Sequence, residues 1–441
     1  MKTNFLSVKN WSWVLILLTG TLMAASLSDE QVIKEAHLNY KVNGNSLLTM
    51  EASSIDIKIS TWDRSEVSVI AKAIYKGKPN DKMTDFLERF ETEVANHIYQ
   101  SSSELEITTD LDIPNKIQIG SKHIGVQIDY GRDELEIYYE LKVPMTLNLD
   151  IKNSYRDLSL FGNHQGKVKI NHYSGDFRGN DFDELNLTLK YGTARVDNVL
   201  TGNFELYEQE LEIESLEDAS IEAKYSKVDI DITKKLLLEA YESEFRFNKV
   251  DEIRGSMKYS RITAREYITA LILTDIYESQ FSLNNVGLVQ ILNESKYCEF
   301  EINEIQKMEL SRSYEDEVTV QEIESFSADS KYLELNFGLL KEDLKIDGYE
   351  SEILIKSISP QLEQFELDGK YNELELNTGG TPVNITANIT YGDIEFDESL
   401  YHRRIYIKED SKQEMKLDSK RSSEKTPTIE LRGYELNAII K

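Results

Sequence analysis

Residues 225–232 read YSKVDIDI, and the same pattern returns throughout the chain. A tyrosine is followed by one or two polar residues and then by a short segment in which apolar and polar residues alternate. In this copy Val228, Ile230 and Ile232 share one face. Alternation with a period of two is typical of a β-strand that is buried on one side. Related copies begin YSRITA at Tyr259, YGTARV at Tyr191, YESEFRF at Tyr241 and YESQFSL at Tyr277.

The tyrosines recur at intervals of 16 to 22 residues, and so regular an interval marks an internal repeat. We predict an all-β chain folded as a single-stranded parallel β-helix, or β-solenoid, with repeats of about 18 residues. Each coil would pair with the coils above and below it, about 4.8 Å away. The predicted repeat positions are Tyr155, Tyr173, Tyr191, Tyr207, Tyr225, Tyr241, Tyr259, Tyr277, Tyr297, Tyr314, Tyr332, Tyr349, Tyr371 and Tyr391.

Stacked coils would place these tyrosines above one another as an aromatic ladder at one corner. Offset stacking of the rings would add roughly 0.5–1.5 kcal/mol per pair. The units have a short form, such as YSKV at Tyr225, and a long form with one more polar residue, such as YESEF at Tyr241. Alternation with the core positions predicts that the tyrosines of the short form are buried. The long form carries Glu after Tyr in alternate units, and we hypothesise that this keeps like charges two rungs apart. A coil of about 35 residues with four strands, spanning two units, remains an alternative.

Four regions follow from the chain's composition. Residues 1–26 have early lysines, an apolar run and then small residues, which is the layout of a secretory signal peptide. An uncleaved N-terminal anchor is the competing interpretation. Residues 27–144 are predicted to be an N-terminal β region with one amphipathic helix, at about 81–96, that caps the first coil. Residues 145–396 would be the regular solenoid. Residues 397–441 would hold a charged segment, 409–425, that forms a loop or the tip of a long hairpin, and the C-terminal capping strands.

The bulk properties restrict the possible partners. A formal net charge of −29 disfavours nucleic acid and anionic membranes, and 40% hydrophobic residues allow a sizeable core. The single cysteine, Cys298, cannot form an intrachain disulfide and is interpreted as a strand residue. No transmembrane segment is expected in the mature chain. The protein should be exported, to the periplasm, the outer membrane or the cell surface.

The sequence holds no catalytic, phosphate-binding, dinucleotide-binding or zinc motif, so we predict no catalytic residue, no cofactor and no metal site. His164 and His172 could approach one another across a rung, but we interpret them as surface histidines. The acidic segments 179–184, 229–232 and 313–317 lack the pattern of a calcium loop. The tyrosine ladder is therefore the one candidate feature.

Two further segments carry a family resemblance. Residues 45–73 hold two alternating strands around the turn STWDRSE, and residues 138–162, YYELKVPMTLNLDIKNSYRDLSLFG, lead into the first repeats. With the tyrosine units, they resemble the bacterial "putative adhesin" family of solenoid type, exported envelope proteins of unknown function related to autotransporter-adhesin head domains. The resemblance implies a Gram-negative source. Glycine after the tyrosine is kept at Tyr191 and Tyr391 but replaced in most units, which puts the corner geometry in question.

These observations predict an exported, non-enzymatic envelope protein that serves as a rigid scaffold for an unknown protein or glycan ligand. One alternative is a periplasmic structural or signalling accessory. Another is a polysaccharide lyase or hydrolase with a groove along the solenoid. The even spacing of the tyrosines leaves no long loops to wall such a groove in the middle of the array, which favours the scaffold.

Overall fold

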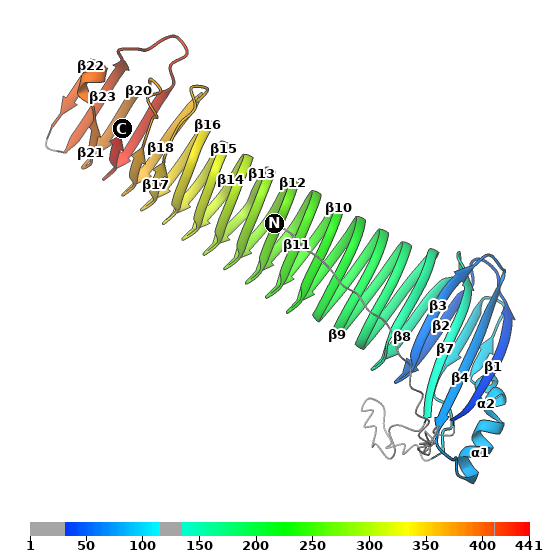
Figure 1. Ribbon diagram of the computed structural model, residues 1–441. Coiled ribbons are helices and arrows are strands. Elements are labelled where there is room, and N and C mark those ends of the chain that lie inside the picture. Colours follow the sequence, from blue (N-terminus) through cyan, green and yellow to red (C-terminus); the bar gives the residue numbers. More distant parts are fainter. Residues whose placement is uncertain (1–30, 115–134, 410) are drawn as a thin grey trace, which may run out of the picture.

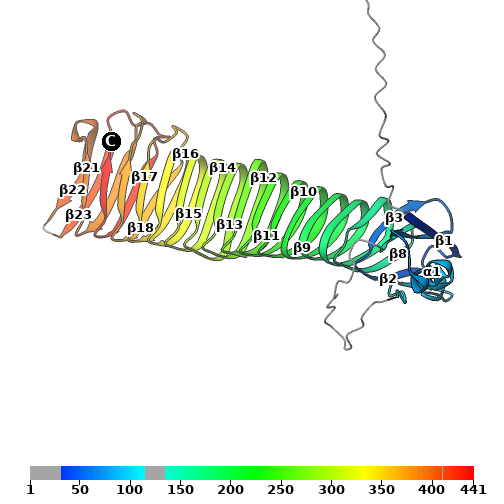
Figure 2. The ribbon, with the colours of Figure 1, turned by 60° about the horizontal axis from the view of Figure 1, so that its bottom comes forward.

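The computed structural model describes residues 31–114, 135–409 and 411–441, and they form a long rod of stacked β coils (Figures 1 and 2). Neighbouring coils pair in parallel through the whole middle of the rod. The prediction of an all-β parallel solenoid is therefore confirmed. The predicted signal peptide, residues 1–26, lies outside the described residues.

One tyrosine unit makes one coil. Lys227 pairs with Glu244, 17 residues later, and Arg261 pairs with Gln280, 19 residues later. The alternative coil of about 35 residues is therefore wrong. The strands that build the middle of the rod are β8 Asn148–Ser154, β9 Leu158–Lys224, which runs through several coils, β10 Lys227–Tyr241, β11 Glu244–Lys258, β12 Arg261–Tyr277, β13 Gln280–Lys296, β14 Glu299–Tyr314, β15 Glu317–Lys331 and β16 Glu334–Tyr349.

Each coil sends a small set of side chains inward. In β10 the chain turns after Ile230, so that two successive residues face outward and Thr233 resumes the inward series. The expectation that Ile232 shares the inward face was wrong, because its side chain is 45% exposed at this turn. The inward residues of the coil are Val228, Ile230, Thr233, Leu236, Leu238 and Ala240.

Thr233 interrupts an apolar column. It pairs in register with Leu216 and Val250, its side chain is buried, and its hydroxyl has no hydrogen-bond partner. Replacing Thr233 with the isosteric valine is expected to raise the free energy of unfolding by about 1–2 kcal/mol, because an unsatisfied buried hydroxyl is removed. Urea unfolding would measure the gain. Thr274→Val is the control, since the exposed Thr274 hydroxyl donates to the Gly255 carbonyl at 3.1 Å and its loss should bring no gain.

At the N-terminal end, a coil is inserted out of chain order. Its strands, β2 and β3, pair in parallel with β8 and β9 on one side and with β6 and β7 on the other. Beyond it, β4 pairs antiparallel with β7 and β1 pairs antiparallel with β4. The bounds are β1 Gln31–Lys41, β2 Leu47–Ser53, β3 Asp56–Trp62, β4 Glu66–Lys76, β5 Ile98–Gln100, β6 Glu104–Thr108 and β7 Leu135–Pro144.

Two short helices, α1 Asp81–Glu88 and α2 Phe90–Asn96, stand where one helix was expected. The Asn80 side chain caps α1 by accepting a hydrogen bond from the Met83 amide at 2.9 Å. The helices lie at the N-terminal end of the rod, beside β1 and β4 (Figure 1). Within the described ranges, no helix has the length and hydrophobicity needed to cross a bilayer.

The C-terminal end differs from the expected plain cap. The last strands, β24 and β25, are inserted between the β18–β19 coil and the β20–β21 coil. The end of the rod is instead covered by β23, which pairs antiparallel with β20, and by β22 beyond it. The charged segment 409–425, expected as a loop or the tip of a long hairpin, contains β23, which pairs antiparallel with β22. The bounds are β17 Glu352–Ile355, β18 Gln364–Lys370, β19 Glu373–Leu376, β20 Asn384–Thr390, β21 Asp393–Phe396, the short 3₁₀ turn η1 Glu398–Leu400, β22 Tyr401–Lys408, β23 Lys412–Ser419, β24 Thr428–Tyr434 and β25 Asn437–Ile440.

Candidate functional site

The candidate site is the corner of the rod at which each tyrosine unit begins. The backbone turns there through one residue in the left-handed region, which is uncommon for residues other than glycine. In short-form units that residue is the tyrosine itself, as in Tyr225 with φ of 55°. In long-form units it is the next residue, as in Glu242 with φ of 45°. The two forms are thus two ways of making the same turn, one residue apart.

The structure brings all fourteen predicted tyrosines into one ladder. Successive ring centroids from Tyr155 to Tyr371 lie 5.3–5.9 Å apart, with interplanar angles of 73–84°. The rings therefore pack edge to face, and the expectation of offset stacking was wrong. Near the end, Tyr434 of β24 lies between Tyr371 and Tyr391. Tyr434 was not predicted as a member of the ladder, although its Tyr-Glu pair, with Glu435 at φ of 52°, repeats the long form.

The ladder lies on the outside of the rod. Nine of its tyrosines are 36–58% exposed, so the prediction that the short-form tyrosines are buried was wrong. The left-handed turn explains the error: it directs the tyrosine outward and returns the residue after the turn to the interior. The exposed ladder residues are Tyr155, Tyr173, Tyr191, Tyr225, Tyr259, Tyr297, Tyr332, Tyr371 and Tyr391.

A column of buried polar residues lies directly inside the tyrosine ladder. Ser226, Ser243 and Ser260 follow the turn in successive coils, and each is buried. The Ser226 amide donates to the Ser243 hydroxyl oxygen, and the Ser243 amide donates to the Ser260 hydroxyl oxygen, both at 3.1 Å. Each hydroxyl donates in turn to a backbone carbonyl just before the turn. The amides and hydroxyls of these serines are therefore satisfied inside the protein.

Cys298 occupies the serine position in its coil and lies just after the turn, outside the strand. Burial and the nearby Asp316 raise the pKa of its thiol to about 12, which keeps it protonated and unreactive. Asp316 takes the same position in the next coil and accepts hydrogen bonds from the Cys298 amide at 2.8 Å and the Ser313 hydroxyl at 2.6 Å. Burial raises the pKa of Asp316. Both residues belong to the architecture of the corner.

The glutamates of the long form affect the tyrosines beside them. The hydrogen bond to Glu278 is the main cause, and burial a smaller one, that raises the pKa of Tyr277 to about 12. A hydrogen bond to the glutamate that follows each of them is also the main cause that raises the pKa of Tyr241, Tyr314 and Tyr349. These hydroxyls remain neutral donors at physiological pH.

The hypothesis that the alternation keeps like charges two rungs apart stays a prediction, although some glutamates do stack on adjacent coils. Glu299, Glu317 and Glu334 pair directly on successive coils. The alternation of the two forms also coincides with the position of the left-handed residue.

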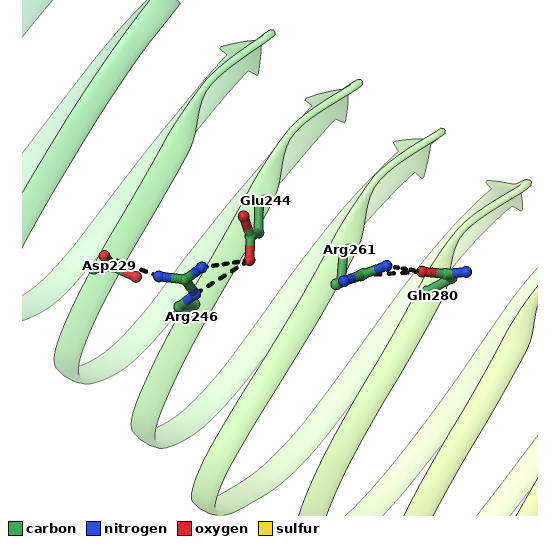
Figure 3. Close-up of polar contacts among 5 residues, drawn as sticks. All are labelled: Asp229, Glu244, Arg246, Arg261 and Gln280. Atoms are coloured by element: carbon green, nitrogen blue, oxygen red, sulfur yellow. Dashed lines mark hydrogen bonds and ion pairs between the residues drawn. The ribbon is translucent and has the colours of Figure 1, made fainter.

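An open groove of about 640 Å³ runs along the ladder in the first half of the rod. Its walls repeat from coil to coil, with tyrosine, serine and glutamate side chains at equivalent places. Glu244, which lines the groove, contacts Arg246 at 2.8 Å, and Arg246 also contacts Asp229 at 3.9 Å. Arg261 donates a hydrogen bond to the neutral Gln280 at 3.0 Å (Figure 3). The lining includes Glu208, Tyr225, Glu242, Tyr259, Ser260 and Glu278.

His164 and His172 are both buried, so their interpretation as surface histidines was wrong. The His164 ring stacks on Phe182, with centroids 5.2 Å apart, whereas His172 pairs in register with Asn153 at a different inward position. Burial lowers the pKa of both imidazoles, that of His164 to about 4. Among the residues that the structure describes, no group of three or more His, Cys, Asp or Glu side chains could hold a metal ion.

The buried His164 makes stability depend on pH. Its pKa is about 4 in the folded state against 6.5 for a free imidazole, so the unfolded chain binds more protons between these values. The contribution of His164 is therefore fully present above pH 6.5 and is lost as the pH falls toward 4, by at most about 3 kcal/mol. His164→Leu is expected to become progressively more stable than the parent chain across this window in urea unfolding. Parallel pH curves would contradict the assignment, and the exposed His402→Gln is the control.

Comparison with known proteins adds little to this picture. No family model and no curated protein matches the chain. Among solved structures, a "putative cell adhesion protein" from Clostridium sporogenes aligns over 93% of this chain and 100% of its own length, with 10% identity and a TM-score of 0.16. At that TM-score the likeness supports no argument about fold or function. The family resemblance stays a prediction from the sequence, while the β-solenoid that it implies is present.

Proposed function

We propose that this chain is an exported, non-enzymatic rod that binds an extended partner along its tyrosine ladder. The observation that carries the proposal is the continuity of the ladder: fifteen rings follow one outer corner, and nine of them are exposed. Identical chemistry repeated along a straight edge suits a long partner that makes many weak contacts at once.

The backbone supports a binding role for these side chains. Non-glycine residues in the left-handed region cost free energy, and such positions persist where the surroundings or a function require them. Asparagine or glycine would make the same turn at less cost. Keeping tyrosine at this position preserves the ring contacts along the ladder, and it also keeps amphipathic rings exposed to solvent.

Protease treatment of intact cells that produce the full chain tests the location. Cleavage from outside, detected with an antibody against the rod, is the expected result for a surface scaffold. Protection until the outer membrane is opened would instead favour the periplasmic accessory. Retention of the unprocessed chain in the cytoplasm would overturn the proposal.

A further inference from the structure

The charge of the surface on one side of the ladder changes halfway along the rod. The first residue of each coil after the turn forms one column beside the tyrosines, and its members pair directly in register. In the first half the column reads Glu210, Lys227, Glu244, Arg261 and Gln280, with opposite charges on neighbouring coils. In the second half it is entirely acidic. We call this part the acidic column: Glu299, Glu317, Glu334, Glu352 and Glu373.

The acidic column has no internal compensation. None of its five carboxylates forms an ion pair with a lysine or arginine in the part of the chain that the structure describes, and Glu299 accepts only the Gln280 amide, at 3.1 Å. Four of the five side chains are exposed. Like charges on adjacent coils repel one another. A positively charged partner would remove that repulsion.

Exposed aromatic rings lie beside this column. Tyr297, Tyr332 and Tyr371 each precede one of its glutamates by two residues and are 36–42% exposed. Arginine and lysine side chains bind favourably over tyrosine faces, and more so when carboxylates are close. A lysine precedes each of these tyrosines, so the negative charge lies on one side of the rings. On that side the surface offers apolar contact and negative charge together along a straight line of about 19 Å, four coil spacings.

We propose that the second half of the ladder is a docking surface for an extended polypeptide segment rich in lysine and arginine. The inference rests on the proposed function and deepens it by naming the partner's chemistry. A single metal ion is a poor fit, because the carboxylates follow a line one coil apart instead of converging, and the described residues hold no metal-binding group. An anionic glycan would be repelled.

The test is binding of a fluorescent hepta-arginine peptide to the full mature chain, followed by anisotropy at low and at physiological salt. Glu317→Gln/Glu334→Gln/Glu352→Gln is expected to weaken binding by about tenfold or more at low salt. Glu210→Gln/Glu212→Gln/Glu244→Gln changes the net charge by the same amount in the first half of the rod, where the column also carries Lys and Arg. This variant should weaken peptide binding by less than about twofold. Equal losses in the two variants would mean general attraction to an acidic rod and would overturn the inference.

A second pair of variants tests the rings. Asparagine tolerates the left-handed backbone, so Tyr297→Asn/Tyr332→Asn/Tyr371→Asn removes the rings while keeping the turn. We expect a loss of affinity of about three- to tenfold, and no loss for Tyr155→Asn/Tyr191→Asn/Tyr225→Asn. Unchanged affinity in the first variant would overturn the role of the ladder.

Circular dichroism of each variant verifies the fold, and the glutamine variants alter only surface side chains. The result of the peptide-binding assay does not depend on where the protein is located in the cell. A chain found in the cytoplasm would overturn the proposed function, whereas the measured peptide binding would still stand.

Discussion

Replacing Ile429 with aspartate is expected to open the C-terminal end of the rod while leaving its middle intact. Ile429 is fully buried in β24 and pairs with Phe365 on one side and Ile385 on the other. An unpaired charge there would separate the coils that β24 joins, at a cost of more than about 4 kcal/mol. Hydrogen exchange measured by mass spectrometry should show lost protection in residues 364–441 and native protection in residues 207–350.

The matched control is Arg432→Gln on the same strand, whose side chain is 55% exposed. It should leave exchange unchanged at both places. Loss of protection along the whole rod in the Ile429 variant would contradict the expected local effect, because each coil of a solenoid contacts only its neighbours.

Replacing Phe300 with alanine is expected to destabilise the middle of the rod. The Phe300 ring is fully buried and stacks on Phe281 of the preceding coil, with centroids 4.6 Å apart and an interplanar angle of 7°. Stacked coils leave little room to close the resulting cavity, so the expected loss is about 3–5 kcal/mol. Urea unfolding would measure it, and exchange should locate it in β13, β14 and β15.

The neighbouring Glu301 provides the control for this change. Its side chain is exposed on the same strand, so Glu301→Ala should change stability by less than about 0.5 kcal/mol. A loss below about 1 kcal/mol for Phe300→Ala would mean that the coils repack around the gap.

The fold was largely predictable because a solenoid repeats locally. Alternation within each unit identified most inward residues, and the spacing of the tyrosines gave the coil length to within a residue or two. The failures have local causes as well. Ile232 and the short-form tyrosines were placed inside because strict alternation was carried through a corner, where a single turn residue changes which side the next side chain faces.

The candidate site was predictable as a set of residues but not as a surface. The fourteen tyrosines were identified, whereas their exposure and their edge-to-face geometry depend on the left-handed backbone at the turn. Tyr434 was missed because its coil is far from its neighbours in the chain. The burial of His164 and His172 could not be read from their surroundings either, since a polar residue at an inward position looks the same in sequence as one at the surface.

The sequence by itself determined the length of the coil and the parallel stacking of the coils, because each coil in the middle of the rod pairs with residues about 18 positions away and the same pattern recurs. Only the tertiary structure decided how the ends are closed. There β2–β3 and β24–β25 insert between coils that are distant in the chain. Such pairing depends on which strand edges remain open once the rod has formed, and local residue patterns do not record it.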